Sequence, residues 1–160
     1  MGNMLLPVVV LAIFLGLGAI ARDQSRSRLP STAMVQTQIA GEVFVEYRNA
    51  LQAYQRSNPG FTGAVPVTAL AASGTQFPQA FLDVAGNQIT AFGSAGRTLT
   101  VYAKVPTATI VSALHVAEND ASLGMASGGV WQSFAPATAG VALPVSVPEG
   151  ALVSMTQTGK

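Results

Sequence analysis

The sequence predicts an α+β fold in which a long amphipathic helix packs on a mainly antiparallel sheet, with one further short helix and an N-terminal transmembrane helix. Three observations lead to this prediction. An uninterrupted apolar run occupies residues 4–21. Between residues 32 and 57, apolar side chains recur every three or four positions, the period of a helix with one buried face. Beyond residue 87, apolar and polar residues alternate in short runs bounded by Gly and Pro, which is typical of strands.

The bulk composition limits the possible functions. The chain has 160 residues, enough for one ordinary domain, and only 9% of them are charged against a usual ~25%. The net charge is +1 and the basic residues are scattered, which argues against nucleic-acid binding. There is no cysteine, which excludes disulfides, thiolate metal sites and a cysteine nucleophile.

Residues 1–21 are predicted to form a membrane anchor. A helix over Met4–Ala21 rises about 27 Å, close to the ~30 Å hydrocarbon core of a bilayer, and it is apolar on every face. Two alternatives stay open. Ala19-Ile20-Ala21 has the form of a signal-peptide cleavage site, although no Lys or Arg precedes the apolar run. Gly2 invites comparison with a prepilin leader, although Pro7 stands where pilins usually carry a glutamate.

Residues 22–31 are interpreted as a juxtamembrane linker. This segment contains Arg22, Arg26 and Arg28, and the positive-inside rule would keep these residues and the following domain in the cytoplasm. The orientation in the membrane is therefore left open by the residues alone.

The soluble domain is expected to span residues 32–160 and to begin with the long helix. The apolar stripe of this helix consists of Val35, Ile39, Val43, Tyr47, Leu51 and Tyr54. Asn58-Pro59-Gly60 ends the helix, because proline and glycine cannot continue it cheaply. An irregular connection over Phe61–Asp83 follows.

The remaining elements are strands and one short helix. Strands over Asn87–Phe92 and Thr98–Val105 form a half-buried hairpin, and a helix of about three turns begins at Thr107. The further strands expected are Leu123–Ala126, Val130–Phe134, Val141–Leu143 and Ala151–Thr156.

No enzymatic site is predicted. His115 is the only histidine, and with the nearby Glu118 and Asp120 it suggests acid–base chemistry, but a surface histidine near a helix end is the simpler interpretation. The chain has neither a nucleophile-elbow motif nor a Walker lysine, and no cofactor or metal is expected.

Four residues are candidates for contacts with a partner protein. Glu42, Glu46 and Arg48 are charged residues grouped on the long helix. Trp131 belongs either to an exposed aromatic patch, together with Tyr102 and Phe134, or to the core.

Two stretches carry a resemblance to a known family. The first is "VFVEYRNALQAYQRSNPGFTGAVP", Val43–Pro66, with its Tyr-Arg-Asn step, a second tyrosine and the N-P-x-F-T-G exit. The second is "GVALPVSVPEGALVSMTQ", Gly140–Gln157. Together with one N-terminal apolar segment, they resemble the PilM family of conjugative-plasmid thin pili, the type IVb pilus systems.

The resemblance implies a non-enzymatic component of the pilus basal body or pilin-export apparatus in the bacterial inner membrane. It also implies a periplasmic soluble domain. With the low charge of the chain, it leads us to expect binding to other pilus-assembly proteins, with no nucleic acid and no small-molecule substrate. Two alternatives remain: a pilin-like minor subunit of the filament, and a small periplasmic enzyme or ligand-binding domain.

Overall fold

A computed structural model gives the fold and describes residues 32–71, 74–135 and 139–159. The chain divides into two compact units, residues 1–36 and 37–160, and the fold below is that of the second. The predicted anchor and linker lie outside the described residues. Within the described ranges, no helix combines the length and the hydropathy that a membrane crossing requires.

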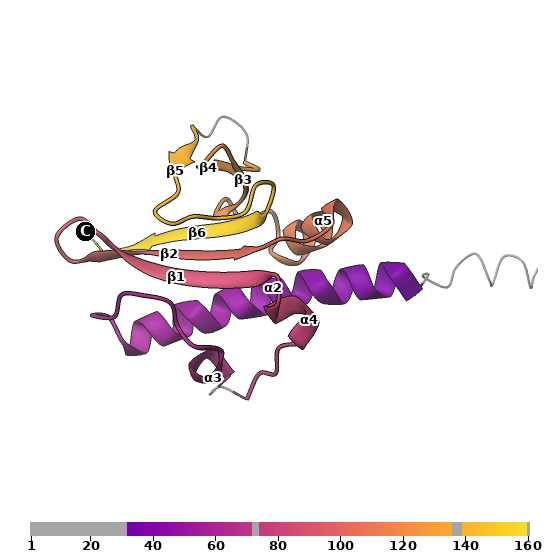
Figure 1. Cartoon of the computed structure of the whole chain (residues 1–160), viewed down its shortest axis with the longest axis horizontal. Coiled ribbons are helices and arrows are strands. Elements are labelled where there is room, and N and C mark those ends of the chain that lie inside the picture. Colours follow the sequence, from indigo (N-terminus) through magenta and orange to yellow (C-terminus); the bar gives the residue numbers. More distant parts are fainter. Residues whose placement is uncertain (1–31, 72–73, 136–138, 160) are drawn as a thin grey trace, which may run out of the picture. The chain divides into compact units, whose positions relative to one another are not determined.

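The long helix α2 covers Thr32–Ser57 and ends where the sequence predicts (Figure 1). The side-chain amide of Asn58 donates a hydrogen bond of 2.9 Å to the carbonyl of Tyr54, which satisfies an acceptor of the last turn. Phe44, Tyr47 and Leu51 of α2 are buried against the sheet.

The sheet has six strands in the described part of the chain, and all of its pairings are antiparallel. The strands are β1 (Ala85–Phe92), β2 (Gly96–Ala103), β3 (Leu123–Ser127), β4 (Val130–Ser133), β5 (Val141–Ala142) and β6 (Leu152–Thr158). Their spatial order is β1-β2-β6-β3-β4-β5, so the C-terminal strand lies in the centre and joins the two hairpins. This confirms the predicted α+β fold with an antiparallel sheet.

The structure contains two short helices that the sequence patterns do not predict. These one-turn helices, α3 (Val67–Leu70) and α4 (Gln79–Leu82), lie in the stretch expected to be irregular. Each follows a proline, Pro66 or Pro78, whose fixed φ suits the start of a helix. A single turn is too short to produce a recognisable apolar period, which explains the error. The expected short helix is present as α5 (Thr107–Val116).

A first core fills the space between α2 and one face of the sheet. It joins Phe44, Tyr47 and Leu51 to Ile89 of β1 and Val101 of β2. The helices α3, α4 and α5 add Leu70, Phe81, Ile110 and Ala113 to the same cluster. Four residues of the predicted stripe of α2 are confirmed, because Tyr47 and Leu51 are buried while Val43 and Tyr54 are half-buried. The side chain of Val35 lies outside the described part of the structure.

Ile39 is the part of the predicted stripe that is wrong. Its exposed fraction is 49%. Gly41 is the first buried position in the described part of α2, and α5 packs closely there, whereas Ile39 lies two residues earlier and its side chain is exposed.

At β2 the second face of the sheet is also covered, which corrects the expectation of a half-buried strand there, whereas β1 keeps the expected alternation of buried and half-buried positions. Thr98 and Thr100 point away from α2 along β2, yet their exposed fractions are 5% and 0%. A second apolar cluster, consisting of Ala126, Trp131, Val153 and Met155, lies on this face. The alternation along β2 predicts solvent on this face because the segments that cover it come later in the chain and leave no mark on the strand itself.

Candidate functional site

The predicted contact residues of α2 divide into two kinds. Glu42 and Glu46 are both exposed. Glu42 accepts a hydrogen bond of 3.1 Å from Gln38 on the preceding turn, and Glu46 accepts one of 3.2 Å from Thr75. Both carboxylates therefore remain within reach of another protein.

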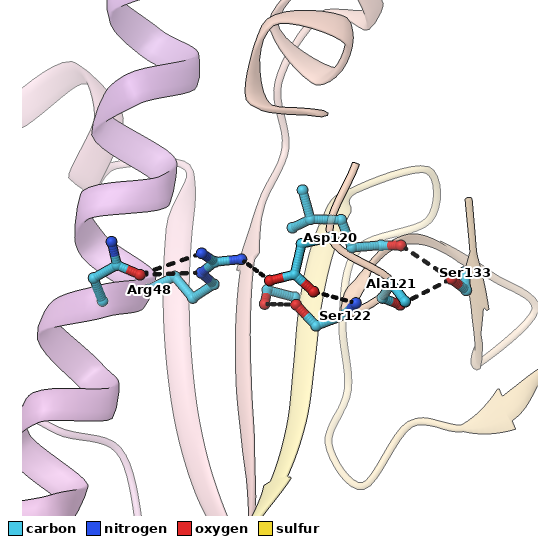
Figure 2. Close-up of polar contacts among 8 residues, drawn as sticks. Arg48, Asp120, Ala121, Ser122 and Ser133 are labelled. Carbon is cyan, nitrogen blue, oxygen red and sulfur yellow. Dashed lines mark hydrogen bonds and ion pairs between the residues drawn. The ribbon is translucent and has the colours of Figure 1, made fainter. Parts of the chain in front are cut away.

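Arg48 has a different position, because its side chain is only 11% exposed and forms an ion pair with Asp120. A guanidinium nitrogen lies 2.9 Å from Oδ2 of Asp120, and the guanidinium also donates two bonds of 3.3 Å to Oδ1 of Asn49 (Figure 2). The pair joins α2 to the turn before β3. No local pattern reveals this contact, since the two residues are 72 positions apart.

Asp120 is held in its charged form. Burial opposes the charge, but hydrogen bonds from Ser122 and the nearby Arg48 outweigh it and lower the pKa of Asp120. The backbone N–H of Ser122 lies 2.8 Å from Oδ1 of Asp120. Asp120 therefore serves as the partner of Arg48, and these hydrogen bonds of its carboxylate do not involve His115.

Serine hydroxyls continue this polar cluster across the sheet. Oγ of Ser122 lies 3.3 Å from Oγ of Ser154 on β6. The hydroxyl of Ser133 on β4 donates a bond of 2.9 Å to the carbonyl of Ala121, as Figure 2 shows. The cluster thus connects α2, the turn before β3, β4 and β6.

The other residues considered for acid–base chemistry lie apart from this cluster. His115 is exposed on α5, and within the described residues its imidazole has no hydrogen-bond partner. Glu118 and Asn119 follow in the left-handed region, with φ of 52° and 58°. In the described ranges, no three His, Asp or Glu side chains are placed to hold a metal ion.

A second polar cluster is buried beneath α2. The amide of Asn87 donates bonds of 2.7 Å to the hydroxyl of Tyr47 and 3.0 Å to the carbonyl of Val65, and its oxygen accepts one of 2.8 Å from the N–H of Val65. Burial is the main cause of a raised pKa for Tyr47. The rings of Phe77 and Phe81 contact Tyr47 edge-on, with centroids 5.0 and 5.5 Å away.

The helix exit is fixed by Arg97, which sequence reasoning does not single out. Its guanidinium donates hydrogen bonds of 3.3 Å to the carbonyls of Gly60 and Phe61. Phe61 packs edge-on against Tyr54 at 5.3 Å, and Gly63, with φ of 124°, pairs with Ile89 of β1. Each of these contacts orients the chain as it leaves α2.

A shallow groove lies between the end of α2 and α3. Its volume is about 380 Å³, and it is lined mainly by apolar atoms of Ala50, Ala53, Tyr54, Ser57, Asn58, Ala69 and Leu70. These lining residues are all uncharged.

Trp131 belongs to the core, which is one of the two interpretations that its sequence allows. Its exposed fraction is 6%, whereas Tyr102 is half-buried and Phe134 is 38% exposed. The indole N–H has no hydrogen-bond partner among the described residues. A role for Trp131 in binding a partner stays a prediction and requires the residue to become exposed.

Comparison with known proteins identifies the family. The profile of the PilM family matches residues 10–155. The fold resembles the crystal structure of PilM from Escherichia coli B7A with a TM-score of 0.58 and 16% identity, covering 81% of this chain and 98% of that one. None of the curated proteins compared with the chain matches it. Because the profile spans nearly the whole sequence and the fold agrees, the chain belongs to the PilM family.

Proposed function

We propose that the protein is a non-enzymatic component of a type IVb pilus or pilin-export apparatus and that it acts by binding other pilus-assembly proteins. Membership of the PilM family supports the coarser statement, a pilus-related role. The finer proposal rests on how the polar side chains are used.

One observation carries the proposal: the polar residues in the stretch that resembles the PilM family make structural contacts within the domain. Tyr47 bonds Asn87, Arg48 pairs with Asp120, and Asn58 caps α2. These contacts engage the polar groups in holding elements together. Glu42 and Glu46, by contrast, remain accessible on α2 in a chain with only 9% charged residues. Accessible charges on a rigid helix suit the recognition of a protein surface.

The proposal includes a location. Residues 4–21 anchor the chain in the bacterial inner membrane, and the domain from residue 32 onward lies in the periplasm. A periplasmic position brings the accessible side of α2 to the compartment in which pilins are assembled.

One experiment tests location and role separately. The chain has no cysteine, so Glu46→Cys supplies a single thiol for a membrane-impermeant maleimide that carries a photo-crosslinker. We use cells whose outer membrane is permeabilised and whose inner membrane is intact. In these cells we expect the thiol to be labelled and, on illumination, to capture pilus-assembly proteins.

The matched control is Asp83→Cys, an accessible carboxylate position at the end of α4. It should be labelled equally well and capture far less of the same proteins. Labelling of both thiols only after lysis would contradict the periplasmic location. Good labelling that captures nothing but lipid or bulk porins would contradict the assembly role.

A further inference from the structure

The second apolar cluster is covered by residues 143–150, which we call the strap. The strap leads from β5 back along β6 before the chain enters that strand (Figure 1). Leu143 and Val147 of the strap are half-buried, and they pack on the cluster that contains Trp131 and Met155. The strap therefore helps to separate this face of the sheet from solvent.

The strap is attached mainly at its ends. The N–H of Leu143 bonds the carbonyl of Gly129 at 3.0 Å, and the N–H of Gly150 bonds the carbonyl of Ala126 at 2.8 Å. Residues 144–149 donate no backbone hydrogen bond within the described structure, in part because Pro144 and Pro148 have no N–H. Segments with few backbone hydrogen bonds open at low free energy.

Two further contacts secure the strap near its end, and both involve Glu149. Its carboxylate accepts a bond of 2.9 Å from the N–H of Gly128, and its carbonyl accepts one from the ammonium group of Lys104. The next residue, Gly150, has φ of 68°, a conformation that glycine adopts at little cost and that suits a hinge.

The face beneath the strap is not fully satisfied. Oγ1 of Thr100 and Nε1 of Trp131 are buried without a hydrogen-bond partner among the described residues. Beneath α2, by contrast, Tyr47 and Asn87 satisfy each other. Buried polar groups without partners destabilise the closed state, and water can satisfy them once the cover lifts.

We propose that the strap, residues 143–150, opens independently of the rest of the domain and uncovers the apolar and aromatic face of the sheet that carries Trp131. The closed strap keeps that face out of solvent, and the open strap exposes it. Because the opening is a property of the fold, it does not depend on the proposed function.

Paired cysteine variants on β6 test the proposal in the full chain in detergent. Val153 and Leu152 are both 0% exposed, but Val153 lies in the cluster beneath the strap and Leu152 lies in the first core. With a thiol reagent such as DTNB, we expect Val153→Cys to react at least tenfold faster than Leu152→Cys. Equal rates for the two thiols, matching global unfolding, would overturn the proposal.

Lys104→Met removes an attachment of the strap. It should speed the reaction of the Val153→Cys thiol at least threefold, without changing the rate for Leu152→Cys. Arg56→Met is the control, since Arg56 bonds the carbonyl of Gln52 on its own helix. Equal acceleration at both thiols would contradict the proposal.

A second measurement needs no cysteine and remains informative if the cysteine variants fold poorly. Trp131 is the only tryptophan, so acrylamide quenching of its fluorescence reports directly on the covered face. Lys104→Met should raise the quenching constant about twofold over that of Arg56→Met. An unchanged constant would overturn the proposal, because Trp131 would then stay covered when the attachment is removed.

Discussion

The buried cluster of Asn87, Tyr47 and Val65 leads to the sharpest prediction about stability. Asn87→Ala removes three hydrogen bonds at once, to the hydroxyl of Tyr47 and to both backbone groups of Val65. The exposed fractions of Tyr47 and Val65 are 2% and 3%, so water has little access to the groups left behind. At about 1 kcal/mol for each buried group without a partner, we expect the free energy of unfolding to fall by about 3 kcal/mol.

Tyr47→Phe provides the comparison within the same cluster. It removes one hydrogen bond and leaves both contacts of Asn87 with Val65, so a loss of about 1 kcal/mol is expected. The double variant should lose no more than Asn87→Ala alone within about 0.5 kcal/mol, because the Tyr47 bond is already absent.

These losses in the free energy of unfolding are measured by urea titration of the full chain in detergent, with circular dichroism as the signal. A loss of about 3 kcal/mol corresponds to a melting temperature lower by about 10 °C for a domain of this size. Gln36→Ala, at an exposed position of α2, is the control and should change stability by less than about 0.5 kcal/mol. If Asn87→Ala cost no more than Tyr47→Phe, the two contacts with Val65 would contribute nothing, and the predicted magnitude would be wrong.

Two further predictions concern helix packing and pH. A Cβ on Gly41 would lie 2.5 Å from Oγ of Ser112 and 2.7 Å from the backbone nitrogen of Ala113. Gly41→Ala should therefore destabilise the fold by about 1–3 kcal/mol. Gly60→Ala is the control and should not destabilise the fold, because a Cβ there would have nothing within 4 Å. Equal urea midpoints for the two variants would show that α5 does not pack closely at Gly41. Asp120 has its pKa lowered from 3.8 in the folded state, so its ion pair stabilises the fold above pH 3.8 and is lost as the pH falls through the lower value. Asp120→Asn should therefore flatten the dependence of the urea midpoint on pH in that acid range, and an unchanged slope would contradict this prediction. At pH 7 the variant should lose about 1 kcal/mol or less of stability, because the carboxylate is 41% exposed.

Local patterns are sufficient to find most of the secondary structure. The end of α2 follows from Asn58-Pro59-Gly60, and the register of the first hairpin follows from the turn around Gly93–Gly96. The same patterns fail for α3 and α4, whose single turns contain no repeated period. They also fail for the second face of β2, because alternation cannot reveal a covering segment that arrives much later in the chain.

The candidate site is less predictable than the fold. The spacing of Glu42 and Glu46 is enough to assign them to an accessible helix face. The same spacing groups Arg48 with them, yet Arg48 is largely buried and paired with Asp120. The aromatic composition does not decide whether Trp131 is exposed, because a tryptophan in a strand fits either face of a sheet.

The long helix, the main strands and the membership of the PilM family can all be inferred without coordinates, because they depend on local periodicity, helix and turn signals, and motifs that lie within one stretch of chain. Three features require the folded structure: β6 lies between β2 and β3, Arg48 meets Asp120, and the strap covers Trp131. These contacts join segments far apart in the chain, and their partners are selected by the packing of the whole domain, which no local pattern encodes.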